Sequence, residues 1–258
     1  MQNKGSYHPI KIKPANLMRY YIITGEHSGD IHGADLIAHL KQADPKADFW
    51  SCGGAAMAQA MGKLPNIDTS TMGYIGLDFL KSIYTLWQRL RCCKQALIEY
   101  HPAVVILIDY SGFNMRLADF AKKRGYIVYY YIPPKIWAHH PKRIKQIKKN
   151  IDKVLSILPF EVAYYQNNGY HTIDYVGNPL VQKVATHRAN ATFLTDNGLP
   201  DKPIIALLPG SRLDEIERIL PHIMVQGNEL EAYQLVVAGL SHIPSQVYQK
   251  LLLPHVKI

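Results

Sequence analysis

The sequence is poor in cysteine and has no long hydrophobic run. Its 258 residues include three cysteines, Cys52, Cys92 and Cys93, which form no CxxC pair and have no metal-ligand spacing. We therefore expect no disulfide framework, but reduced thiols in a cytosolic protein. No stretch of about 18 uninterrupted apolar residues is present, so no membrane-spanning segment is expected. The basic start lacks the apolar core of a secretory signal, and we interpret residues 1–17 as a leader before the first strand.

Acidic residues are scarce in the larger part of the chain. Residues 1–194 contain 24 basic and 13 acidic residues, whereas residues 195–258 contain 5 basic and 7 acidic ones. The apolar share of 48% and the charged share of 19% are ordinary for a soluble protein and exclude a disordered or fibrous chain. The basic excess predicts an anionic partner, which could be a nucleic acid, a phosphorylated ligand or an anionic membrane face.

Short apolar runs alternate with amphipathic stretches along the chain. This pattern is typical of repeated βαβ units and predicts an α/β fold with a mostly parallel sheet, covered by helices on both faces. We expect strands at residues 19–24, 48–52, 104–109, 127–132, 153–158, 173–176, 204–208 and 234–238. We expect helices at residues 29–42, 55–61, 75–99, 115–124, 135–150, 161–168, 188–197 and 214–230.

A domain boundary is indicated between residues 177 and 200. Gly177-Asn178-Pro179 forms a turn signal, and a loop rich in glycine and proline at residues 198–203 precedes a new strand. We expect a first α/β domain at residues 18–185 and the beginning of a second at residues 186–258. A second domain of this type needs about 100–150 residues, so it is expected to be incomplete. The closing run LLLPHVKI is strand-like, and we expect no partner for it.

The first predicted strand ends in a glycine-bearing turn, TGEHSGDIHG, at residues 24–33. Such a turn directs backbone N–H groups and the positive end of a helix toward the sheet edge where ligands bind. It is not GxGxxG, so it does not indicate a dinucleotide site. Two roles stay open, a ligand site or a simple turn in which Ser28 or Asp30 caps the helix. The spacing of His27 and His32 does not favour a metal pair.

A second candidate site follows the third predicted strand, which ends at Asp109. A carboxylate at this end of a buried strand lies at the ligand edge and can act as a general base. The alternative is that Asp109 caps the next helix. Asn114 could position a ligand hydroxyl, or it could cap the same helix.

A third candidate site is the turn Pro209-Gly210-Ser211-Arg212 after the strand at residues 204–208. Backbone donors, a helix N-terminus and a guanidinium together suit a diphosphate. The alternative is a plain turn in which Arg212 pairs with Asp214 or Glu215.

Two further stretches have open roles. The apolar stretch at residues 75–87, followed by basic residues, is either a core-facing helix or a membrane-contacting surface. The aromatic segment at residues 129–140 leads into a basic run, which is either a solvated helix face or an RNA contact, and it lacks an RNA-binding signature. The run consists of Lys142, Arg143, Lys145, Lys148 and Lys149.

Eight stretches, taken together and in this order, resemble the lipid-A-disaccharide synthases. They are GEHSGDIHGADLI (25–37), GGAAM (53–57), MGYIGLDFL (72–80), IDYSGFNMRLA (108–118), YYIPPKIWAHHPKRIKQIKK (130–149), LPFEVAYY (158–165), VGNPL (176–180) and ALLPGSRLDEI (206–216).

The resemblance implies a GT-B fold of two Rossmann-type domains, with an acceptor domain at residues 18–185 and part of a nucleotide-sugar domain at residues 186–258. It implies an inverting transfer of 2,3-diacylglucosamine from its UDP form to 2,3-diacylglucosamine 1-phosphate, as part of lipid A biosynthesis. The partners would be these two substrates and the inner-membrane surface, on the cytoplasmic side of a Gram-negative-type bacterium. No nucleic acid is expected, and a homodimer stays open.

The resemblance also assigns roles to single residues. Asp109 matches the proposed catalytic base. No cofactor is implied, and because no DxD pattern is present, no metal is required. The substrate-binding candidates are Gly25, Glu26, Ser28, Gly29, Asp30 and Asn114, and the diphosphate-binding candidates are Gly210, Ser211 and Arg212.

The sequence departs from the family pattern at two points. Gly112 stands where the family has a second acidic residue, and the later sugar-nucleotide segment is missing, so we expect a C-terminally truncated chain. The alternatives are an inactive fragment that acts as a basic membrane- or nucleic-acid-binding module, and another GT-B enzyme such as a UDP-sugar epimerase.

Overall fold

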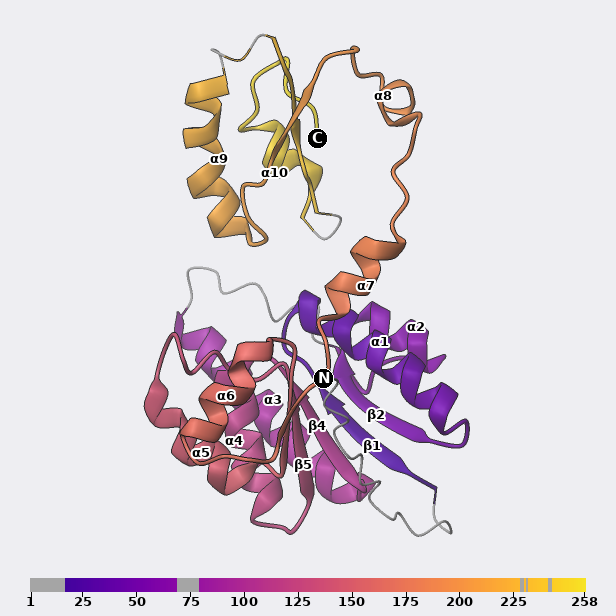
Figure 1. Ribbon diagram of the computed structural model, residues 1–258, viewed down its shortest axis with the longest axis vertical. Helices are drawn as coiled ribbons and strands as arrows, with labels where there is room; N and C mark the ends of the chain where they lie inside the picture. Colours follow the sequence, from indigo (N-terminus) through magenta and orange to yellow (C-terminus); the bar gives the residue numbers. More distant parts are fainter. Residues whose placement is uncertain (1–16, 69–78, 228–229, 231, 241–242) are drawn as a thin grey trace, which may run out of the picture. The chain divides into compact units, whose positions relative to one another are not determined.

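The computed structural model describes residues 17–68, 79–227, 230, 232–240 and 243–258 (Figure 1). The chain divides into two compact units, Met1–Gln182 and Lys183–Ile258. The boundary expected from the sequence lies three residues later, at residue 185. All but the last residue of the expected leader, residues 1–17, lies outside the described residues. Each unit has a hydrophobic core of its own.

A seven-stranded parallel sheet forms the centre of the first unit. Its strand order, β3-β2-β1-β4-β5-β6-β7, reverses between β1 and β4, as in Rossmann-type doubly wound sheets. The prediction of an α/β fold is confirmed. The strands are β1 (Arg19–Ile23), β2 (Asp48–Gly53), β3 (Ile67–Asp68), β4 (Val104–Ile108), β5 (Ile127–Tyr131), β6 (Lys153–Ser156) and β7 (Ile173–Tyr175).

Helices cover both faces of this sheet (Figure 1). One face packs against α1 (His27–Ala43) and α2 (Ala55–Met61), and the other against α3 (Phe79–Tyr100), α4 (Ser111–Lys122), α5 (Ile144–Asn150) and α6 (Pro159–Asn167). Because successive strand residues point to opposite faces, each strand supplies both cores. Tyr21 and Ile23 enter the core beneath α3–α6, whereas Ile22 enters the core beneath α1 and α2.

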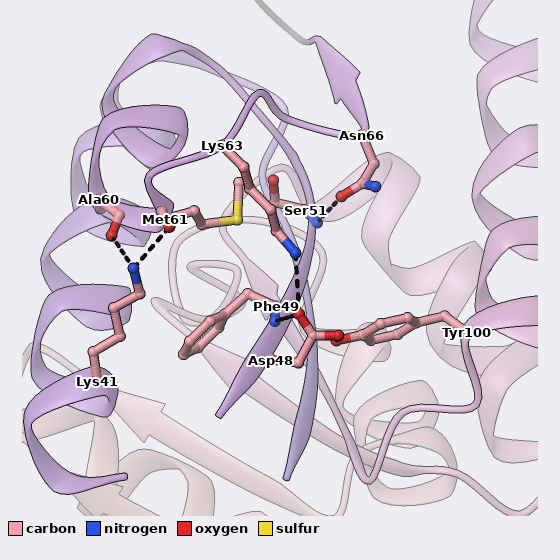
Figure 2. A network of polar contacts seen from close by, with 9 residues as sticks. All are labelled: Lys41, Asp48, Phe49, Ser51, Ala60, Met61, Lys63, Asn66 and Tyr100. Atoms are coloured by element: carbon pink, nitrogen blue, oxygen red, sulfur yellow. Dashed lines mark hydrogen bonds and ion pairs between the residues drawn. The ribbon is translucent and has the colours of Figure 1, made fainter. Parts of the chain in front are cut away.

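A polar network holds the start of β2 (Figure 2). One carboxylate oxygen of Asp48 lies 3.0 Å from Lys63 Nζ, and the other accepts a 3.0 Å hydrogen bond from the Tyr100 hydroxyl. Burial alone would raise the pKa of Asp48, but these two partners hold it below its ordinary value. Because Asp48 is the first residue of β2, the network lies at the amino ends of the parallel strands, away from the edge where ligands of such sheets bind.

The second unit is small. Its parallel strands β8 (Ile204–Leu207) and β9 (Gln234–Val237) pack with the buried face of α9 (Leu213–Gly227), which supplies Ile216 and Leu220 to the core. The short helices α8 (Phe193–Asp196) and α10 (Ser245–Gln249) complete the described elements, and α7 (Pro179–Thr186) crosses the division between the units.

One expectation about the end of the chain is wrong. The run at residues 251–258 does have a pairing partner, because Lys257 forms a parallel bridge with Val236 of β9. The amide of Lys257 donates to Leu235 O at 3.2 Å, and Lys257 O accepts from the amide of Val237 at 2.7 Å. This edge of β9 is therefore partly covered.

Two helices differ clearly from expectation, and proline explains the first of them. The helix expected at residues 135–150 exists only from Pro141 onward, as a 3₁₀ turn and then α5, because proline fits the first turn of a helix but not its interior. The helix expected at residues 188–197 is reduced to α8, while Pro179, expected in a turn, begins α7. Residues 75–78 of the helix expected at 75–99 lie outside the described residues.

Candidate functional site

The point where the strand order reverses brings two predicted site loops together. The loop after β1 and the loop after β4 leave the sheet at its carboxyl edge, one toward α1 and the other toward α4 on the opposite face. In open α/β sheets ligands bind at this switch point. The loops touch directly, because a Cβ on Gly25 would lie 2.1 Å from Cδ1 of Tyr110. Glycine is therefore required at this position by the ring that covers it.

The loop after β4 is a strained turn. Asp109 and Tyr110 both have a φ of 46°, in the left-handed region that residues other than glycine rarely adopt. Two consecutive residues of this kind need support from their surroundings. The carbonyl of Asp109 provides it by accepting 2.7 Å hydrogen bonds from Asn114 Nδ2 and from the Tyr130 hydroxyl.

The side chain of Asp109 is half-buried and lies at the ligand edge, as predicted. Its carboxylate makes no hydrogen bond or ion pair with the described residues, and α4 begins at Ser111 without a side-chain cap. The alternative role as a helix cap is therefore not observed. Burial raises the pKa of Tyr130 well above its ordinary value, and the charge of Asp109 adds to that rise.

Asn114 has neither of the two roles considered from the sequence. It is fully buried in the first turn of α4, and its amide nitrogen donates to the carbonyls of Ile108 and Asp109 at 3.1 and 2.7 Å. Among the described residues its Oδ1 has no hydrogen-bond partner. Asn114 therefore stabilises the turn that carries Asp109 and is not exposed to bind a ligand itself.

The loop after β1 offers fewer exposed groups than expected. Gly25 and Gly29 are buried, and a Cβ on Gly29 would lie 2.6 Å from Oγ1 of Thr24. Glu26 is half-buried at the start of α1, and Ser28 is exposed in its first turn. Burial raises the pKa of Tyr110, and the charge of Glu26 raises it further, so Glu26 acts electrostatically on the turn after β4.

Asp30, expected to bind substrate, is buried and caps a neighbouring helix instead. Its Oδ1 accepts from the amides of Gly54 and Met57 at 2.7 and 3.1 Å, and its Oδ2 accepts from Ala56 at 2.9 Å. These amides begin α2, where a negative charge is favourable.

At the other end of α2, Lys41 Nζ donates to Ala60 O and Met61 O, both at 2.8 Å (Figure 2). Helix α1 thus places a negative charge at the start of α2 and a positive charge at its end. We call these two sets of contacts the clamp of α1 on α2, and Asp30 is part of it.

Arg143 is a site residue that sequence reasoning missed. It lies in the basic run, but unlike its exposed neighbour Lys142 it is half-buried, and its NH1 donates to Ser111 Oγ at 2.9 Å. Ser111 follows the strained turn directly. No pattern in the sequence distinguishes Arg143 from the lysines around it, because its partner Ser111 belongs to another element.

The turn after β8 holds an anion, but one that belongs to the chain itself. The Glu215 carboxylate accepts from the amides of Ser211 and Arg212 at 2.9 and 3.3 Å, and it pairs with the Arg212 guanidinium at 3.3 Å. Backbone hydrogen bonds, first that of Ser211, lower the pKa of Glu215. Gly210 has a φ of 128°, and a Cβ there would lie 2.7 Å from that of Glu215. The donors predicted for a diphosphate are present, and the alternative pairing of Arg212 with Glu215 is also observed.

Helix α3 leaves two large aromatic side chains in solvent. Tyr84 is 65% exposed and Trp87 69%, whereas Leu90 and Cys93 of the same helix are buried. Leu86, in the described part of the stretch at residues 75–87, packs against the core, so this part has both a core-facing and an exposed apolar surface. None of the helices that the structure describes is long and apolar enough to cross a bilayer. Within the same residues, no three His, Cys, Asp or Glu side chains gather in a way that could hold a metal ion.

Comparison with known sequences gives consistent matches. A profile of the lipid-A-disaccharide synthetase family matches residues 20–254. The lipid-A-disaccharide synthase of Trichlorobacter lovleyi is 40% identical over 208 residues, which cover 80% of this chain and 54% of that protein. Lipid-A-disaccharide synthase 1 of Legionella pneumophila strain Paris is 43% identical over 212 residues, with the same coverage. The chain spans about half the length of the curated relatives it matches.

Solved structures with the same fold are more distant in sequence. The UDP-GlcNAc 2-epimerase of Neisseria meningitidis bound to UDP-GlcNAc has a TM-score of 0.63 at 12% identity, over 93% of this chain and 71% of that one. The Methanocaldococcus jannaschii epimerase in complex with UDP-GlcNAc and UDP has a TM-score of 0.62 at 14% identity, over 93% of this chain and 72% of that one. This likeness concerns the fold alone, which is of the GT-B type.

Proposed function

Because this chain belongs to the lipid-A-disaccharide synthase family, we propose that it takes part in an inverting glycosyl transfer from a UDP-activated diacylglucosamine to diacylglucosamine 1-phosphate. The observation that carries the proposal is the strained turn at the switch point, which holds a half-buried carboxylate without a hydrogen-bond partner among the described residues. Strain of this kind persists where the surrounding structure enforces it, and it clusters at active sites.

In the proposed step, Asp109 acts as the general base. Its carboxylate accepts the proton of the acceptor's primary hydroxyl as that oxygen attacks the anomeric carbon of the donor. A new carbon–oxygen bond forms on the opposite side of the sugar from the breaking bond, so the configuration inverts. The electron pair of the broken bond leaves with the β-phosphate of UDP, and Asp109 later returns its proton to water.

The leaving diphosphate is assigned to the turn after β8. Amide groups of Ser211 and Arg212 and the Arg212 guanidinium are donors of the kind that stabilise developing phosphate charge. Since Glu215 uses the same donors, a diphosphate has to displace its carboxylate. Glycine at position 210 leaves room for the Glu215 side chain, because a Cβ there would lie 2.7 Å from that of Glu215.

The remaining assignments concern location. We assign the protein to the cytoplasmic face of the inner membrane, where it would reach both lipid substrates at the bilayer surface. The exposed Tyr84 and Trp87, with Arg91 exposed one turn further along α3, support contact with an anionic bilayer surface.

Substitution of the proposed base tests the function. In this chain extended by the C-terminal part of the Legionella relative, Asp109→Asn should lower turnover by about 10²- to 10⁴-fold with little change in UDP affinity. Turnover is measured as UDP release with both lipid substrates in detergent micelles. Asp119→Asn, which removes the same charge from the surface ion pair with Lys123, is the matched control and should stay near the unsubstituted rate.

Two results would contradict the proposal. One is an Asp109→Asn variant whose turnover stays close to that of the unsubstituted protein. The other is epimerisation of a UDP-sugar without any lipid acceptor, which would assign the chain to a different reaction on the same fold.

A further inference from the structure

The segment from α4 to the start of β6 carries an unusual charge distribution. From Asp119 to Asp152 the chain has no acidic residue in between, but it has nine basic ones. Lys122, Lys123 and Lys149 pair with these two flanking aspartates, which leaves the centre of the segment without a carboxylate of its own. A segment with this excess of positive charge attracts anions.

The centre of this segment forms an open depression on the surface. Its volume is about 430 Å³, and its lining residues are His140, Pro141, Lys142, Arg143 and Gln146. His140 has a φ of 57°, so the chain turns sharply just before Pro141 starts the 3₁₀ turn. Since a water molecule occupies about 30 Å³ in the liquid, the depression has room for a phosphate group together with several waters.

Arg143 connects the depression to the strained turn after β4. One nitrogen of its guanidinium donates to Ser111 Oγ, two residues after Asp109, and no carboxylate among the described residues pairs with it. A guanidinium has five N–H donors in a planar fork, so donors remain for a second partner. Burial raises the pKa of Tyr130, and Asp109 and Arg143 act on it in opposite directions, so both charges lie in the electrostatic range of one phenol.

We propose that this depression binds the phosphate monoester of the acceptor, with Arg143 and Lys142 as its charged ligands. The inference rests on the proposed function, since it concerns the acceptor of that reaction. A phosphate held by Arg143 places the acceptor sugar beside the turn that carries Asp109. A phosphate monoester is doubly charged near neutral pH and suits a planar fork next to an ammonium.

Direct binding measurements on the chain itself test this without any turnover. The probes are glucosamine 1-phosphate and, as the control that lacks the phosphate, glucosamine. Binding is followed by NMR through the side-chain resonances of Gln146 and Arg143, which report on the depression alone. The chain should bind the phosphate ester and not the plain sugar.

Three variants separate a site from general charge attraction. Arg143→Gln and Lys142→Gln should each weaken glucosamine 1-phosphate by about tenfold or more, because each removes a charge-assisted hydrogen bond. Lys145→Gln makes the same change in net charge at an exposed α5 residue outside the lining and should change the affinity by less than about twofold. Among the described residues Lys142 forms no hydrogen bond with Ser111, so its loss tests binding without disturbing the strained turn after β4.

The outcomes that would overturn the inference are distinct. Equal weakening by Lys145→Gln and Arg143→Gln would indicate diffuse attraction instead of a site. A phospholipid headgroup would be the ligand if Arg143→Gln abolished binding to vesicles containing phosphatidic acid and left glucosamine 1-phosphate binding intact. Asp109-dependent turnover without phosphate binding would reject the phosphate site alone. Phosphate binding without turnover would reject the proposed function, and with it the acceptor as the ligand, but not the phosphate site.

Discussion

At the scale of single residues, the site depends on a side chain that no ligand is expected to touch. Asn114 is buried, and both hydrogens that it donates go to carbonyls at the end of β4. These bonds oppose the relaxation of Asp109 and Tyr110 out of the left-handed region. The geometry of the proposed base is therefore set from inside the protein.

Asn114→Ala should damage stability and turnover together. The substitution leaves two buried carbonyls short of a donor, and each such loss costs about 1–3 kcal/mol, partly offset here because Tyr130 still donates to Asp109 O. We expect the free energy of unfolding to fall by about 2 kcal/mol, measured by urea denaturation, and turnover to fall although Asp109 is intact. Asn114→Asp keeps the acceptor atoms but loses the donors, so it should not rescue either quantity. Unchanged stability in Asn114→Ala would contradict this role.

At the scale of elements, the clamp of α1 on α2 is the clearest example of matched charge. Asp30 lies at the start of α2 and Lys41 at its end, as the helix dipole requires. The clamp joins the first two βα units of the sheet, and the loop after β1 is fixed at its base.

Asp30→Asn should lower the free energy of unfolding by about 2 kcal/mol, because a neutral amide replaces a buried carboxylate that accepts three backbone hydrogen bonds. Thermal or urea unfolding measures the change. Asp35→Asn makes the same substitution on the same helix at a half-exposed position and should have a smaller effect. If Asp30→Asn instead kept its stability and lost substrate affinity, the original expectation of a substrate contact would be restored.

Most of the elements could be predicted because buried parallel strands are continuous apolar runs. The two-residue strand β3 has no such run and was not predictable. Asp109 could be placed from the end of its strand, since position along a strand determines the sheet edge. The directions of three other side chains could not be predicted, because each depends on atoms from another element. Asp30 binds the start of α2, Asn114 binds the end of β4, and Arg143 binds Ser111.

At the scale of the whole molecule, the two units have independent cores, and the chain between them is exposed. Residues 183–192 are exposed throughout, whereas the buried core residues of the first unit, among those that the structure describes, lie between Tyr21 and Ile173. Exposed connections of this kind are the preferred sites of proteolytic cleavage.

Limited proteolysis should therefore cut within residues 183–192 and release a first unit that remains folded. The fragment is identified by mass spectrometry, and its fold by circular dichroism and a cooperative thermal transition. Since Asn114, Asp109 and Arg143 all belong to this unit, the fragment should also bind glucosamine 1-phosphate with the affinity of the intact chain. Loss of cooperative unfolding in the fragment would show that the first unit depends on the second.

The left-handed pair at Asp109 and Tyr110 has one further consequence. A turn that is locked by buried hydrogen bonds loses its conformational entropy when the chain folds, so little is left to lose when a sugar arrives. The acceptor should then meet a rigid receptor, and structures of the first unit with and without ligand should superimpose at these residues. Selectivity for the acceptor would then come from its fit to a rigid binding site and not from a loop that changes conformation on binding.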